Sequence, residues 1–263
     1  MNLRLKSAPL AAAIAVIAMG TSSANAALIP GTDPSSNSSV FISLAERNNL
    51  NQVVRNLVID TGSRALDVFA GTPWSTTTAQ EADILAFVST SAATSRVVFN
   101  VGGALTDGSF ATDLQGFLTT GNAAGPAIDN YSQLNAGVIN TITKIGNANN
   151  GTFNPNGVLA SNGPSDPGFH ANAWGDSYGG ALQPSNEVLL GAANQIIGWK
   201  TNADFEIIRS QLGFITSSLQ SGDISFNAAV VPVPAAAWLL LSAFGTLAGL
   251  RRTTGRVRTT ETA

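Results

Sequence analysis

The chain has 263 residues, no cysteine and a formal net charge of −3 at pH 7. The length allows one domain with a substantial core, and the lack of cysteine excludes a disulfide framework and a thiolate metal site. Residues 27–229 carry seven basic and fifteen acidic side chains, a net charge of −8, and this acidic balance argues against a nucleic-acid partner.

The first 26 residues have the layout of a secretory signal peptide. Arg4 and Lys6 form a positive start, residues 8–19 form an apolar run, and Ala24-Asn25-Ala26 is a small-x-small cleavage motif. The apolar run is too short, and wrongly flanked, for a mature membrane helix. We therefore expect cleavage after Ala26, so that the exported chain begins at Ala27.

The body, residues 27–229, begins with a pattern typical of a β-hairpin. Residues 40–44 and 52–60 are rich in β-branched and other apolar side chains, which predicts two antiparallel strands. Residues 64–69 predict a continuation of the sheet, with Leu66 and Phe69 directed inward.

A helical period replaces the strand pattern at residues 79–88, and Thr78 with Glu81 three residues later predicts a capped helix start. Residues 95–105 return to alternation and predict a strand, with Val97, Phe99 and Val101 on one face. Gly102-Gly103 in that strand indicates a bulge or a close approach of another group to the backbone.

Residues 110–151 predict helix in pieces, because Leu134, Val138, Ile142 and Ile145 recur at helical spacing. We expect Ser132 to cap that helix. Residues 153–183 have no period and contain His170, the only histidine of the chain. A loop of this length is uncommon inside a domain and is usually functional or mobile.

Residues 187–199 fit either a short helix or a strand. Residues 212–219 and 223–230 predict a closing hairpin with Ser221-Gly222 in its turn. These elements together predict a mainly β body, an antiparallel β-sandwich with inserted α-helices, followed by one C-terminal transmembrane helix.

One motif has a catalytic pattern: Val58-Ile59-Asp60-Thr61-Gly62-Ser63 matches the active-site signature of aspartic proteases. That chemistry needs two aspartates that share a proton. Asp166-Pro167-Gly168 does not supply the second, because proline stands where a hydroxyl residue is required. A homodimer would supply the second aspartate from its other subunit, and Ile196-Ile197-Gly198 would match the apolar-apolar-glycine sequence of such dimeric proteases. No tyrosine that could serve as the flap residue lies between Asp60 and Tyr131. We favour a turn in which the Asp60 carboxylate binds local backbone.

The sequence gives little indication of any other catalytic or ligand-binding site. His170 has no second histidine for a metal and no serine or cysteine nucleophile motif beside it, and the chain lacks phosphate-loop, dinucleotide and calcium-loop motifs. Trp74, Trp174 and Tyr178 either stack on sugars or fill the core, and we favour the core. We expect a protein that is not an enzyme and binds no cofactor or metal.

The end of the chain, residues 230–252, has three parts in a fixed order. Pro232 and Pro234 make an extended neck, residues 235–250 carry no charge, and Arg251 and Arg252 follow at once. The uncharged run is roughly 24 Å long as a helix, somewhat short of the roughly 30 Å hydrocarbon core. The basic residues predict a cytoplasmic end, with 253–263 as a basic tail.

This arrangement resembles the VPLPA-type variant of the PEP-CTERM sorting signal. Val231-Pro232-Val233-Pro234-Ala235 stands where the family has Val-Pro-Leu-Pro-Ala, with Val233 as the one departure. The resemblance implies a partner, an exosortase-type membrane enzyme that cuts near the proline motif, and a precursor held in the inner membrane. Diffuse matches in the body, such as Asp60-Thr61-Gly62 in place of Asp-Leu-Gly, point to the same group of secreted proteins.

We therefore expect a protein exported through the inner membrane to the cell surface, outer envelope or extracellular matrix. The alternative is a module that binds extracellular polysaccharide. A dimeric aspartic protease using Asp60 is the third and weakest hypothesis.

Overall fold

The computed structural model describes residues 28–29, 38–105, 115–121, 128–169, 187–202 and 206–228. Within these ranges the chain forms ten strands and three helices. The strands are β1 (Ser39–Arg47), β2 (Val53–Arg64), β3 (Trp74–Ser75), β4 (Arg96–Leu105), β5 (Gly116–Gly121), β6 (Val158–Ser161), β7 (Val188–Leu189), β8 (Asn194–Thr201), β9 (Ile207–Ser217) and β10 (Ile224–Ala228). The helices are α1 (Ala65–Phe69), α2 (Thr78–Ser89) and α3 (Tyr131–Ala148).

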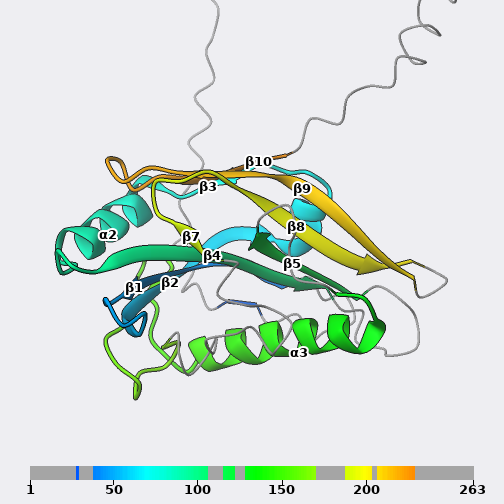
Figure 1. The fold of residues 1–263 in the computed structure, drawn as a ribbon, viewed down its shortest axis with the longest axis horizontal. Helices are drawn as coiled ribbons and strands as arrows, with labels where there is room; N and C mark the ends of the chain where they lie inside the picture. Colours follow the sequence, from blue (N-terminus) through cyan, green and yellow to red (C-terminus); the bar gives the residue numbers. More distant parts are fainter. Residues whose placement is uncertain are drawn as a thin grey trace, which may run out of the picture.

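All described strand pairs are antiparallel, and the strand order is β3-β10-β9-β8-β5-β4-β1-β2-β6, with β7 paired to β4. The prediction of a mainly antiparallel β body with inserted helices is confirmed. The strands are hydrogen-bonded as one sheet, which curls so that β8, β9 and β10 lie across from β1, β2 and β4 (Figure 1). This curled sheet takes the place of the two separate sheets of a sandwich.

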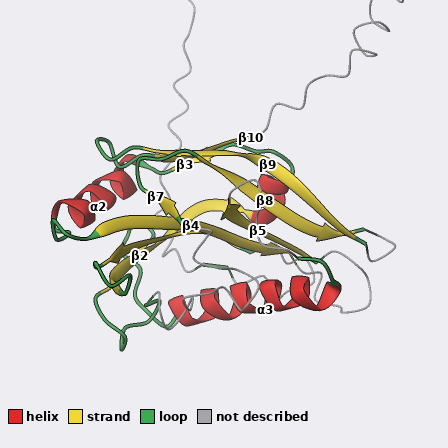
Figure 2. Ribbon diagram, in the orientation of Figure 1, coloured by secondary structure: helices red, strands yellow, loops and turns green. Residues whose placement is uncertain are grey.

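The curl creates an inner and an outer apolar surface because side chains alternate along each strand. The inner core contains Ile42, Ile59 and Phe99, together with residues of β8, β9, β10, α1 and α2. The outer cluster contains Phe41, Val58 and residues of α3, which runs along the outside of the sheet (Figure 2). The prediction that Val97, Phe99 and Val101 share one face of the strand at 95–105 is confirmed, because all three belong to the inner core.

The β1–β2 hairpin and the β9–β10 hairpin lie where the sequence pattern placed them. Residues 187–199, which fitted helix or strand equally, form β7 and most of β8. Of the two alternatives predicted for Gly102, a bulge or a close approach to the backbone, the structure shows the close approach. There is no bulge, because β1 pairs with β4 without a register shift at this residue. A Cβ atom on Gly102 would lie 2.5 Å from Cζ of Phe41.

Two segments have a different structure from the one predicted. Residues 65–69 form the helix α1, and Leu66 is exposed, while Phe69 does pack against the inner core. Residues 116–121 form the strand β5, whose Phe117 and Leu118 pack on opposite faces of the sheet. Both segments were too short for the sequence period to distinguish helix from strand.

The long segment 153–183 is also not free of regular structure, since 158–161 form β6, paired with β2. Helix caps differ from the prediction by one or two residues. The Thr77 hydroxyl accepts the Gln80 N–H at the start of α2, and Asn130 rather than Ser132 caps α3 by accepting the Gln133 N–H.

The helix α2 sits against the rim of the curled sheet and contacts both of its halves. The Gln80 side chain donates to the backbone oxygens of Asp60 in β2 and of Asn156 just before β6. On the other side the β9–β10 turn lies close, because a Cβ on Gly222 would be 2.5 Å from the backbone oxygen of Glu81. The helix is therefore fixed between the two ends of the sheet.

Both predicted terminal signals lie outside the described residues, and so does the predicted transmembrane helix at 235–250. In the ranges given above, no helix is long and apolar enough to cross a membrane.

Candidate functional site

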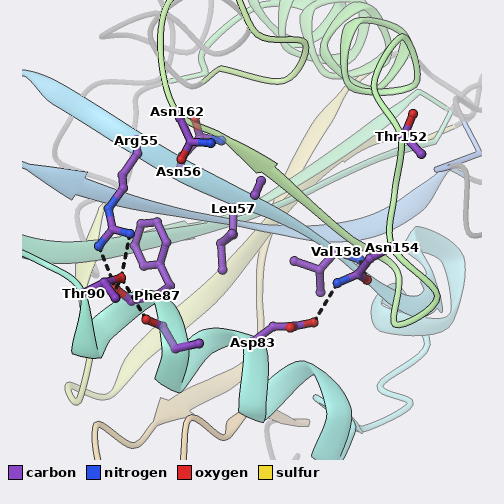
Figure 3. Close-up of a pocket in the computed structure, with 12 residues that line it drawn as sticks. Arg55, Asn56, Leu57, Asp83, Phe87, Thr90, Thr152, Asn154, Val158 and Asn162 are labelled. Atoms are coloured by element: carbon purple, nitrogen blue, oxygen red, sulfur yellow. Dashed lines mark hydrogen bonds between the residues drawn. The ribbon is translucent and has the colours of Figure 1, made fainter.

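A groove of about 500 Å³ lies between α2 and the rim strands β2 and β6 (Figure 3). Its volume falls within the roughly 300–1,000 Å³ that is usual for small-ligand pockets. Its wall comes from one helix, its floor from two paired strands and its rim from the segment around β6. The lining residues are Arg55, Asn56, Leu57, Asp83, Ala86, Phe87, Thr90, Thr152, Asn154, Val158, Ala160 and Asn162.

The wall of the groove holds a carboxylate in a fixed position. The Asp83 Oδ2 atom accepts hydrogen bonds from Asn154 Nδ2 at 3.0 Å and from Asn156 Nδ2 at 2.9 Å. The Asn154 amide oxygen in turn accepts the backbone N–H groups of Asn156 and Val158. The turn before β6 and the helix α2 are thus joined by one side-chain network.

The second feature of the wall is a guanidinium stacked on an aromatic ring. Arg55 Cζ lies 4.3 Å from the ring centroid of Phe87. The guanidinium donates to Glu46, to the Thr90 and Ser91 hydroxyls and to the Phe87 backbone oxygen. Its charge is already paired with Glu46, so it offers little attraction to an anionic ligand.

Glu46 is buried, and burial alone would raise its pKa. The Ala92 N–H, Arg55 and the Ser95 side chain bind the carboxylate, and together with the Arg55 charge they lower the pKa of Glu46 below its ordinary value. Glu46 therefore stays ionised at neutral pH, and its hydrogen bond with Arg55 fixes the orientation of the guanidinium at the edge of the groove.

The floor of the groove is apolar. Leu57 of β2 lies opposite Ala160 of β6 in the sheet register. Val158 is buried beside them, whereas Ala160 and Ala86 are exposed toward solvent. Small side chains at these positions allow a ligand to approach the strand backbone closely.

The rim carries polar groups that face solvent. Thr152 and Asn162 are both exposed. Within the described part of the chain, neither side chain has a hydrogen-bond partner, and Asp83 Oδ1 has none either. In Figure 3 Asn162 lies on one side of Leu57 and Asp83 on the other, so the free groups frame the apolar floor.

Asp60 lies outside this groove, within β2 rather than at the end of a strand. Its Oδ1 atom accepts the Gly62 N–H at 2.9 Å, which is the local bond predicted for a turn. Gly62 has a φ of 72°, a left-handed conformation that glycine adopts at no steric cost. Burial raises the pKa of Asp60, although the Gly62 bond and the charge of Arg64 act in the opposite direction.

Among the described residues, Asp166, the aspartate of the second Asp-x-Gly sequence, is not brought to Asp60. The Asp60 N–H binds the backbone oxygen of Gly157, just before β6, whereas Asp166 accepts the N–H of Asn162, just after β6. The two side chains therefore stand at opposite ends of that strand. Ile196, Ile197 and Gly198 lie in β8, which β5, β4 and β1 separate from β2.

Trp74 is buried, as predicted, and stacks on Phe226 with ring centroids 6.1 Å apart. The other residues singled out in the sequence lie outside the described ranges. They are His170, Trp174, Tyr178, the cleavage residues Ala24, Ala26 and Ala27, and the sorting-signal residues Val231, Pro232, Val233, Pro234, Ala235, Arg251 and Arg252.

The sequence did not indicate the groove. Its polar residues come from α2 and from a segment rich in asparagine, and nothing in their spacing sets them apart from other Asn-rich stretches. The one available signal was Asp83 on an otherwise weakly charged helix. Among the described residues, no group of three or more histidine, cysteine, aspartate or glutamate side chains is placed to hold a metal ion. Comparisons with protein-family models, with curated proteins and with solved structures found no match.

Proposed function

We propose that this chain is an exported, non-enzymatic protein of the cell surface or extracellular matrix, processed at a C-terminal sorting signal by an exosortase-type membrane enzyme. The observation that carries the proposal is the order of features at 230–252: a proline neck, an uncharged run and an arginine pair. A secretory signal peptide at 1–26 supports the same direction of transport.

The composition of the body agrees with this proposal. A surface protein that lacks disulfides must be stable through packing and internal polar contacts. The described body contains two apolar clusters, a buried ion pair between Arg47 and Glu187, and a half-buried ion pair between Arg55 and Glu46. Its solubility rests on Asn, Ser, Thr and Gly and on a net negative charge.

The protease hypothesis receives less support. Asp60 is engaged with local backbone, and the Gln80 side chain binds the backbone oxygen of the same residue. A dimeric active site needs this carboxylate free at a subunit interface, facing its copy. Polysaccharide binding remains the alternative function of the body.

Export and retention are tested by following the protein in the cells that make it. N-terminal sequencing of the exported form is expected to begin at Ala27, and a mature form that retains Arg4 would refute the signal-peptide assignment. Changing both Arg251→Asn and Arg252→Asn is expected to weaken retention in the inner membrane, measured by fractionation with antibodies against the body. Unchanged retention would remove these arginines from the signal.

A further inference from the structure

We propose that the groove between α2, β2 and β6 binds a neutral saccharide, held by Asp83, Thr152 and Asn162 over the floor formed by Leu57 and Ala160. The proposal concerns the body and does not depend on how the tail is processed. It rests on the cavity, on the rim groups that have no hydrogen-bond partner among the described residues and on the charge balance of its wall.

The first argument is the distribution of polarity. A sugar ring presents hydroxyl groups around its edge and C–H groups on its faces. The groove offers the matching arrangement, because an apolar floor of Leu57 and Ala160 is bordered by a carboxylate, a hydroxyl and an amide. Pockets of this kind use few polar groups, placed to fix the orientation of the ligand.

The second argument is that the acceptor is held in place before any ligand arrives. Asp83 Oδ2 is held by two amides, those of Asn154 and Asn156, so the direction of Oδ1 is fixed. Oδ1 then accepts from a ligand hydroxyl, and a hydrogen bond to a carboxylate is stronger than one to a neutral acceptor. Little side-chain entropy remains to be lost on binding.

The third argument concerns charge. The Arg55 cation is paired with Glu46 and donates to three further oxygen atoms, so it provides little attraction for a ligand carboxylate or phosphate. Asp83 repels such groups, and the body as a whole is acidic. The wall therefore favours an uncharged, hydroxyl-rich ligand over an anionic one.

The test uses the full-length chain in detergent on an array of neutral and uronic-acid-containing oligosaccharides, followed by titration calorimetry with the neutral sugars that bind. Ala160→Trp places a large side chain on the floor and is expected to weaken binding at least tenfold. The matched control is Ala82→Trp, at an exposed position of α2 that does not line the groove. This control is expected to bind like the wild type.

Two milder variants keep the proposal testable if Ala160→Trp does not fold. Thr152→Val and Asn162→Ala each remove a rim group at an exposed position, and each is expected to weaken binding by about three- to tenfold. Circular dichroism verifies that all variants are folded. The proposal is overturned if no neutral glycan binds, if only acidic glycans bind, or if Ala160→Trp binds as tightly as Ala82→Trp.

Discussion

Arg55 of β2 lies over the ring of Phe87 of α2, with its Cζ atom 4.3 Å from the ring centroid. The same guanidinium is paired with Glu46 of β1, so one side chain connects the first hairpin of the sheet to the helix at its rim. This contact also forms one end of the groove. The stability of the rim and the shape of the candidate site therefore depend on the same residue.

Replacing Arg55 by Met is expected to destabilise the fold by about 2–4 kcal/mol, because Glu46 is left buried without its partner. The double change Arg55→Met and Glu46→Gln is expected to recover part of that loss, since the buried charge is gone. Urea unfolding of the two single variants and the double variant measures the coupling. If the loss of unfolding free energy in the double variant equals the sum of the losses in the two single variants, the two side chains do not stabilise each other.

Gly102 tests the packing of the curled sheet. A methyl group there would lie 2.5 Å from Phe41 Cζ, so Gly102→Ala is expected to cost about 1–3 kcal/mol. Combining it with Phe41→Leu is expected to relieve the clash. Gly146→Ala in α3 is the control, because no atom lies within 4 Å of its added Cβ and the change is expected to stabilise the helix by about 0.5–1 kcal/mol. Equal effects at the two glycines would contradict this packing.

Lys144 gives the fold a pH dependence. It is buried on the inward face of α3, and burial lowers the pKa of Lys144 to about 7. Between about pH 7 and the ordinary lysine value of roughly 10.4, the unfolded chain holds a proton that the folded chain has lost. The free energy of unfolding therefore rises with pH across this window and is lowest below it.

Lys144→Met removes this dependence. The difference in unfolding free energy between wild type and variant is expected to shrink as pH rises from about 6.5 to about 9.5, with the variant the more stable at the lower pH. Urea titrations at the two pH values measure it, and a constant difference would show that Lys144 does not titrate in this window.

Asp60→Asn distinguishes a turn residue from a catalytic one. Asparagine keeps an oxygen that accepts the Gly62 N–H, so the unfolding free energy is expected to change by at most about 1–2 kcal/mol. Burial raises the pKa of Asp60, which makes loss of the charge well tolerated. Proteolysis at acid pH that pepstatin inhibits, and that disappears in this variant, would reverse the assignment.

The parts of the fold that the sequence predicted are those with a long regular pattern. The alternation at 95–105 and the spacing of Leu134, Val138 and Ile145 each extend over enough residues for one period to dominate. The secondary structure of shorter segments depends on the elements that lie next to them in the fold. Residues 65–69 form a helix where the chain leaves β2, and 116–121 form a strand because β4 and β8 pair on either side.

The sequence could not predict the candidate groove, because the groove depends on contacts between distant segments. Asp83 and Asn154 are 71 positions apart, and only the pairing of β6 with β2 brings their segments together. No local pattern specifies that pairing. The Asp60–Gly62 hydrogen bond, by contrast, joins positions two apart within β2, and local chemistry alone predicts it.

The measurement that most directly tests the proposed function is the processing of a variant with both Pro232→Ala and Pro234→Ala. Transferring each arginine of the pair into hydrocarbon costs about 2.5–3.5 kcal/mol, so under the proposed function Arg251 and Arg252 would hold the prolines at the outer interface, where an extended backbone would be available to a membrane protease. The double proline variant is therefore expected to remain full-length in the membrane, whereas the control Val233→Leu, which matches the family motif, is processed normally. If the proline variant reaches the surface or the medium at the size and rate of wild type, residues 230–252 do not act as a sorting signal.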